Sequence, residues 1–99
     1  ALDLNVNLTP LAIADLRHIH RHIAKNDRMA ADRVISRIRQ VIEIFESFPL
    51  MGRVGDMENT REFAISGLPY TIVYRIISAS ELDILTIVHN RQNYPSQSD

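Results

Sequence analysis

The pattern of apolar and polar residues changes period along the chain and predicts its elements. Apolar and polar residues alternate over 2–8, which predicts a half-buried strand. Apolar residues then recur every three or four positions over 10–25 and 27–47, the spacing of two amphipathic helices. Thr9 before Pro10 is typical of a helix start. Because few residues separate the two helices, we expect an antiparallel hairpin.

The second half of the chain returns to period two. We expect an irregular connection over 49–59, where two glycines interrupt any pattern. Strands are predicted over 61–65, 70–77 and 82–89, and short turns between them indicate an antiparallel meander. The predicted fold class is α+β in the order β-α-α-β-β-β, with the helical hairpin on one face of the sheet and a single domain over 1–99.

The last strand is apolar on both faces. Alternation places Leu82, Ile84 and Val88 on one face, and Leu85 and Ile87 on the other. One helical layer can cover only one face of a sheet. We therefore expect the tail of the chain or another protein to cover the second face, and the free chain to self-associate or bind hydrophobic dye.

Composition and charge narrow the function classes. The 99 residues are 45% hydrophobic and include no cysteine, which excludes disulfides and thiol catalysis and fits a cytoplasmic protein. No apolar run is long enough to span a membrane. The net charge is −1, but residues 17–39 carry seven cations and two acids, a local charge of +5. A solvated helix surface is the simpler explanation of this segment, although it would also suit an acidic partner.

Three histidines in the first helix raise the question of a metal site. His18 and His22 lie one turn apart, with Asp15 a turn earlier, so the two imidazoles could share a metal ion. A site needs a third ligand, and His20 lies on another face of the helix. We predict no metal. The chain has no P-loop or dinucleotide fingerprint, and we expect no cofactor.

One group of residues in the meander and tail could carry chemistry. Arginines can stabilise a phosphoryl group, and His or Tyr can transfer a proton, so these residue types suit phosphodiester cleavage. They equally suit docking on an acidic protein surface, and each could serve as a core aromatic, a strand-edge charge or a strand-end polar residue. The group comprises Arg61, Tyr74, Arg75, His89, Arg91 and Tyr94.

Short motifs in a fixed order give a resemblance that covers nearly the whole chain. These are FPLMGR at 48–53, TRE at 60–62, GLPYTIVYR at 67–75 and VHNR at 88–91. In this order they resemble the RelE/ParE superfamily, the toxins of bacterial type II toxin–antitoxin modules. The resemblance implies the same strand, helix and strand order that the periodicity predicts.

The RelE branch of this superfamily implies a ribosome-dependent mRNA endonuclease. Its pattern places an arginine where this chain has Thr71, and lysines where it has Glu62 and Ala64. Three expected cations are therefore missing, which removes much of the stabilisation of a phosphodiester transition state. If the chain is nevertheless an RNase acting on ribosome-bound mRNA, its candidate catalytic residues are His89, Arg91, Tyr94 and Arg61.

The ParE branch is the closer resemblance and implies a binding inhibitor of DNA gyrase, not an enzyme. The likeness lies in Arg61-Glu62, in the PYxxxYR strand and at the end of the last strand. It implies a cognate ParD- or RelB-type antitoxin that lays apolar side chains on the toxin and acidic ones beside its arginines. The expected target-binding residues are Arg61, Tyr74, Arg75, His89 and Arg91. The expected antitoxin-binding residues are Arg33, Arg37, Leu85 and Ile87. A third alternative is a toxin fold that has lost toxicity and serves only as a binding module.

Overall fold

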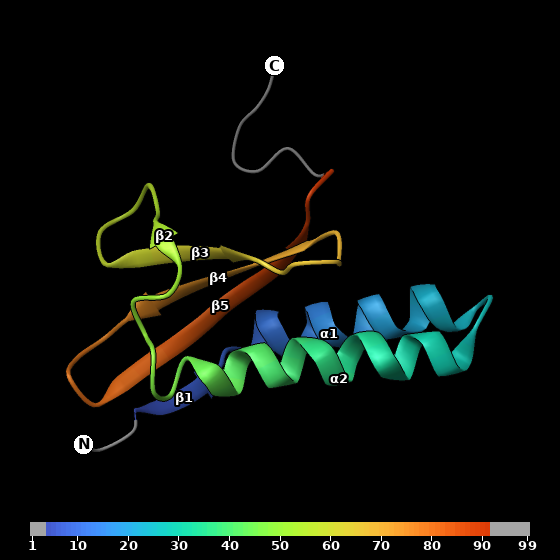
Figure 1. The fold of residues 1–99 in the computed structure, drawn as a ribbon, viewed down its shortest axis with the longest axis horizontal. Helices are drawn as coiled ribbons and strands as arrows, with labels where there is room; N and C mark the ends of the chain where they lie inside the picture. Colours follow the sequence, from blue (N-terminus) through green and yellow to red (C-terminus); the bar gives the residue numbers. More distant parts are fainter. Residues whose placement is uncertain (1–3, 92–99) are drawn as a thin grey trace.

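Five strands form one mixed sheet (Figure 1). A computed structural model describes residues 4–91. The sheet order is β1-β5-β4-β3-β2, in which β1 runs parallel to β5 and all other neighbours are antiparallel. The predicted meander is confirmed for β3, β4 and β5, and the first strand extends it on the outer edge of β5. The strands span Asn5–Leu8 (β1), Arg53–Val54 (β2), Thr60–Ala64 (β3), Tyr70–Ile76 (β4) and Glu81–His89 (β5).

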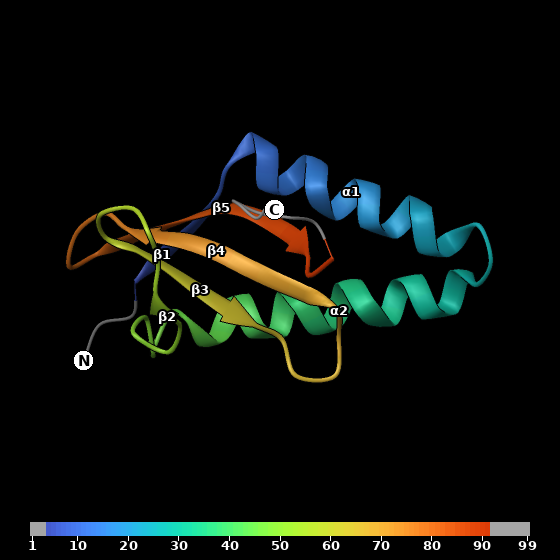
Figure 2. The same cartoon turned by 90° about the horizontal axis from the view of Figure 1, so that it is seen from above.

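Two helices, α1 (Pro10–Ala24) and α2 (Arg28–Ile44), form the predicted hairpin and cover one face of the sheet (Figure 2). The Thr9 hydroxyl oxygen accepts a hydrogen bond from the first turn of α1 at 3.1 Å, and the Asp27 carboxylate does the same for α2 at 3.0 Å. These side chains satisfy N–H groups that have no partner within a helix. Neither helix of the described chain is long and apolar enough to cross a membrane.

The connection after α2 contains a strand that the sequence does not reveal. The two-residue strand β2 pairs with β3, so that Arg53 lies opposite Glu62 and Val54 lies opposite Arg61. The expectation of an irregular connection over 49–59 is therefore wrong at these two positions. Two residues are too few to show a period, and this strand exists because β3 offers it an edge.

A β-bulge at Leu85 changes which residues of β5 face the helices. Ile84 and Thr86, on either side of it, pair with consecutive residues of β4, so Leu85 is an extra residue in β5. Ile84 and Ile87 are consequently both in the core, at 0% and 4% exposure. The prediction that they point to opposite faces is wrong, because the bulge shifts the alternation by one residue.

The core lies between the sheet and the hairpin. The rings of Phe45, which follows α2, and Tyr74 in β4 stack with their centroids 4.3 Å apart, and both side chains are fully buried. Phe63 of β3 meets Phe45 edge to face at 5.9 Å. These aromatic contacts join the end of α2 to the middle of the sheet.

Exposed apolar residues gather in the connection from α2 to β3 and not on β5 as expected. Leu85 is half-buried, whereas Phe48, Leu50, Val54 and Met57 are 63%, 64%, 74% and 66% exposed. This connection rises along one end of the molecule (Figure 1). This end of the molecule is therefore a candidate partner-binding surface.

Candidate functional site

Tyr74 and Arg61, both expected to contact a target, hold the loop after α2 in place. The Tyr74 hydroxyl donates to Pro49 O at 2.7 Å and accepts from the Gly52 N–H at 2.9 Å. The Arg61 guanidinium donates to Leu50 O at 3.2 Å and to Gly52 O at 2.7 Å. These bonds fix the loop backbone at both ends. Tyr74 is 0% exposed, so its side chain offers no surface to a partner in this structure.

The environment of Tyr74 keeps its hydroxyl protonated. Burial raises the pKa of Tyr74 above its ordinary value, and the Gly52 N–H and the charge of Arg61 offset only part of that effect. A protonated hydroxyl is required here, because the carbonyl oxygen of Pro49 can only accept a hydrogen bond. Burial raises the pKa of Tyr70 in the same way.

The three positions at which RelE-like RNases are expected to carry cations come together on the open face of the sheet. Glu62, Ala64 and Thr71 line one concavity of about 300 Å³. Arg53 also reaches it, but Arg53 Nη2 lies 2.9 Å from Glu62 Oε1 in an ion pair. The Thr71 hydroxyl donates to Asn90 Oδ1 at 2.6 Å. Among the described residues, Arg53 is the one lysine or arginine that lines this concavity.

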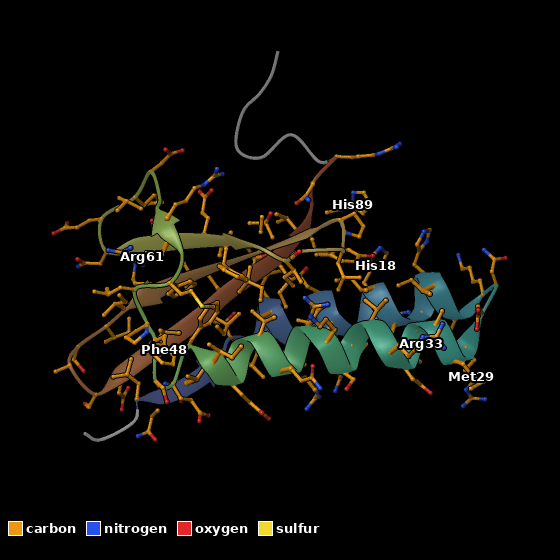
Figure 3. The ribbon with its side chains drawn as sticks, viewed as in Figure 1. His18, Met29, Arg33, Phe48, Arg61 and His89 are labelled. Carbon is orange, nitrogen blue, oxygen red and sulfur yellow. The ribbon has the colours of Figure 1, made fainter. Side chains whose placement is uncertain are left out.

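His89 and Arg91 lie where β5 ends beside α1. The His89 ring packs edge to face on Tyr70, with centroids 5.3 Å apart, and His89 Nδ1 accepts from the Arg91 N–H at 3.1 Å. Both residues line a cavity of about 320 Å³ that His18 of α1 also lines (Figure 3). Tyr94, the remaining residue of the RNase hypothesis, lies outside the described residues.

The expected target-binding set is divided between two ends of the sheet. Tyr70, beside His89, and Tyr74 are four residues apart in β4, a separation of about 13 Å at the usual rise of a strand. Arg75 follows Tyr74, on the opposite face of the sheet, across from Asp83 of β5. One end therefore holds Arg61, Tyr74 and Arg75, and the other holds His89 and Arg91.

The expected antitoxin-binding residues are also divided. Arg33 and Arg37 are exposed on α2, where Arg37 Nη2 donates to Ser66 O at 3.1 Å. Leu85 and Ile87 instead belong to β5, which packs against α1. The bulge turns the Ile87 side chain into the core, where it is 4% exposed. Leu85 stays half-buried.

The histidines of α1 do not gather a set of metal ligands. The rings of His18 and His22 stack with their centroids 6.5 Å apart, and His20 Nε2 lies 2.8 Å from an Asp32 carboxylate oxygen. Within residues 4–91, no three His, Cys, Asp or Glu side chains are placed to hold a metal ion.

Asp15 binds β5 and does not pair with the histidines. Its Oδ2 accepts from the Thr86 hydroxyl at 2.5 Å and from the Ile87 N–H at 2.9 Å. Farther back along β5, the Thr9 hydroxyl lies 2.8 and 2.9 Å from the carbonyl oxygens of residues 84 and 85. These two side chains therefore bind backbone groups of β5 at the end of β1 and beyond it. A carboxylate in a helix gives no sign in the sequence that it will bind a distant strand.

The sequence also gave no role to the exposed side chains of the loop after α2. The run FPLMGR at 48–53 carries a family resemblance but no recognisable site. Its one usable signal was a set of large apolar residues between Pro and Gly, in a connection with no helical or strand period. Whether these apolar side chains face water depends on Arg61 of β3 and Tyr74 of β4, which bind the loop backbone and lie later in the chain.

Comparisons with known proteins agree with this fold. The family model of the ParE toxin of the type II toxin–antitoxin system, parDE, matches residues 6–94. Y4kP of Sinorhizobium fredii (strain NBRC 101917 / NGR234), which its name describes as an inferred toxin, is 36% identical over 90 residues, which cover 91% of this chain and 92% of Y4kP. A solved structure of the chromosomal ParDE TA system from P. aeruginosa shares the fold with a TM-score of 0.78 at 20% identity, over 87% of this chain and 95% of that one. Because the family model spans most of its residues, the chain belongs to the ParE toxin family of type II toxin–antitoxin systems.

Proposed function

We propose that this ParE-family toxin inhibits growth by binding DNA gyrase in the cytoplasm, and that a cognate ParD-type antitoxin neutralises it in a hetero-oligomer. Membership of the ParE family supports the role of toxin. The ParE-like PYxxxYR strand supports gyrase as the target. The solved relative is a ParDE system, which supports a ParD-type partner.

The observation that favours target binding over RNA cleavage is the Arg53–Glu62 ion pair in the concavity on the open face of the sheet. A phosphodiester transition state gathers negative charge, and each strong donor aimed at it contributes about 10²–10³-fold to the rate. Here Glu62 contributes a carboxylate, and Arg53 is paired with it at 2.9 Å. Thr71 has no charge, and its hydroxyl donates a hydrogen bond to Asn90 Oδ1. His89 also lines this concavity, but the carboxylate of Glu62 would repel a phosphate there, so the concavity is poorly suited to hold one.

Two assays on one purified preparation separate the functions. The chain is added to DNA gyrase in a supercoiling assay, and to a translating extract in which mRNA cleavage is followed by primer extension. We expect inhibition of supercoiling and no codon-linked cleavage. The control is Arg53→Ala, which removes the exposed arginine of the concavity. If the concavity does not bind the target, this variant should inhibit supercoiling about as well as the parent.

Other outcomes point to the alternatives. Cleavage of ribosome-bound mRNA that His89→Ala or Arg91→Ala abolishes would establish the RNase and refute the gyrase proposal. Normal growth on expression without antitoxin would instead favour a chain that only binds. Arg91 is exposed, whereas the His89 ring packs on the buried Tyr70, so circular dichroism has to show that His89→Ala is folded.

Arg33 and Arg37 are the proposed contacts for the antitoxin. Both are exposed on α2, within a segment of net charge +5 over 17–39. An acidic segment of a partner gains electrostatic attraction along this helix, and that attraction also speeds association. The half-buried Leu85 lies on a different element, so it would meet a different part of the same partner.

A further inference from the structure

The loop that joins α2 to β2 displays large apolar side chains to solvent. Phe48 and Leu50 are 63% and 64% exposed, and Met51 is 38% exposed. Residues 47–51 line an open cavity of about 440 Å³. Residues 48–51 are called the apolar loop below.

Tyr74, which is buried, and Arg61, which is half-buried, fix the backbone of the apolar loop. Tyr74 and Arg61 bond to its carbonyl oxygens and to Gly52 beyond it. A Cβ on Gly52 would lie 2.8 Å from the Tyr74 hydroxyl oxygen and 2.9 Å from Glu62 O, so the backbone approaches its anchors more closely than another residue allows. A loop shaped for stability alone would turn its large apolar side chains inward, whereas this loop is fixed with them in water.

We infer that the apolar loop is a preorganised contact site for the protein target of the toxin, with Arg61 and Tyr74 as positioning residues. A fixed loop binds at lower entropic cost, because it does not have to be ordered when the partner arrives. An aromatic and an aliphatic side chain on a rigid support fit a small apolar pocket, as in the hot spots of protein interfaces. This inference rests on the proposed function, since it requires that the chain act by binding a protein.

Charge around the apolar loop indicates which partner it fits. Residues 43–62 include five acidic residues and two arginines, a net charge of −3, whereas residues 17–39 carry +5. Figure 3 shows Phe48 at one end of the molecule and Arg33 at the other. An acidic antitoxin segment suits the basic end. The apolar loop suits an apolar pocket rimmed by Lys and Arg, on an enzyme that carries basic surfaces to handle DNA.

Phe48→Ser and Leu50→Ser test this inference, with Met29→Ser as the matched control. Met29 is 71% exposed near the opposite end of the molecule, so all three variants replace an exposed apolar side chain in the same way (Figure 3). Parent and variants are titrated against DNA gyrase in the supercoiling assay. Each loop variant should need at least about tenfold more protein for half-inhibition, the effect of truncating a hot spot. Met29→Ser should match the parent.

Arg61→Gln and Arg61→Lys test the positioning role. Glutamine cannot span the two carbonyl oxygens that the guanidinium holds, while lysine keeps a charged donor for one of them. We expect inhibition to weaken about tenfold in Arg61→Gln and to recover in part in Arg61→Lys, by analogy with other interface truncations. A lower melting temperature with full inhibition in Arg61→Gln would show a role in stability only and overturn the positioning role.

The possible failures are distinguishable. Loop variants that inhibit gyrase as well as the parent does would overturn this inference and leave the proposed function standing. If the parent arrests growth without inhibiting gyrase, gyrase is excluded as the target. The inference then requires that cells expressing Phe48→Ser or Leu50→Ser grow, while Met29→Ser still arrests growth. A parent that does neither overturns both. If the loop variants lose only antitoxin binding, the apolar loop contacts the antitoxin. If they lose only a homodimer seen by sedimentation, the loop contacts a second copy of the chain. Either result would overturn the inference.

Discussion

The Tyr74 hydroxyl donates to one end of the loop after α2 and accepts from the other. Tyr74→Phe keeps the stacked ring but leaves Pro49 O and the Gly52 N–H without this partner. We expect the free energy of unfolding to fall by about 1–3 kcal/mol, the usual effect of a buried polar group left unpaired. Urea titration measures it. Tyr70→Phe, on the same strand but remote from the loop, is the control and should change stability less.

The same hydroxyl predicts a loss of stability at alkaline pH. Burial raises the pKa of Tyr74 above its ordinary value of 10.0, so the unfolded chain releases this proton at lower pH than the folded chain does. The stabilisation is therefore complete below about pH 10 and is lost as the pH rises through the folded pKa. Urea midpoints from pH 8 to 11 should fall more steeply for the parent than for Tyr74→Phe. Parallel slopes would contradict this assignment.

Gly52 is a second residue on which the loop depends. In Gly52→Ala the new Cβ would lie within 3 Å of both the Tyr74 hydroxyl and a backbone oxygen of β3, so one of them has to move. We expect a destabilisation of about 1–3 kcal/mol, typical of overpacking in a filled site. Thermal unfolding measures it, and Gly67→Ala is an instructive contrast. A Cβ at Gly67 meets nothing within 4 Å, so its cost comes from the positive φ alone.

At the scale of elements, α1 and the edge of β5 depend on each other through Asp15. Asp15→Ala removes the acceptor of the Ile87 N–H and of the Thr86 hydroxyl. We expect a loss of about 1–3 kcal/mol, because the N–H is left without its partner in a half-buried place. Asp32→Ala, which breaks an exposed pair with His20, is the control and should cost no more than about 1 kcal/mol. Equal effects in urea titration would refute the role of Asp15.

The elements differ in how far the sequence predicts them. Both helices and the meander are predicted from periodicity. In each element the buried apolar residues recur at a regular spacing over several turns of helix or several residues of strand. The bulge at Leu85 cannot be read in this way, since the sequence of β5 looks regular and only pairing with β4 reveals the extra residue. The same limit applies to β2, which has two residues.

The sites are less predictable than the elements, for a related reason. Arg61 and Tyr74 are recognisable as unusual residues, but their partners are backbone atoms of a loop about ten and twenty-five residues earlier. Residue type suggests that both side chains contact a partner, whereas in the structure both bind the backbone of this loop. The absence of cations at Glu62, Ala64 and Thr71 is predictable from the sequence. That prediction needs only the positions of these residues in their strands, and no knowledge of their side-chain contacts.

At the scale of the whole molecule, charge is separated along its length. Arg33→Ala with Arg37→Ala should weaken binding of a ParD-type antitoxin about tenfold at low salt, because two attractive contacts are lost at the basic end. The difference should shrink as ionic strength rises, since exposed charges are screened. Arg53→Ala, outside the basic segment, is the control. Fluorescence anisotropy of a labelled antitoxin measures all three, and equal affinities for parent and double variant would exclude this surface.

The side chains of Thr9 and Asp15 have a consequence for how any partner can bind. A sheet edge with open N–H and C=O groups accepts an added strand from almost any chain, because backbone recognition ignores sequence. From the end of β1 onward, these two side chains already engage backbone groups of residues 84, 85 and 87. Strand addition is therefore blocked along this stretch of the edge. A partner that approaches here has to recognise side chains, which makes its choice of toxin dependent on sequence.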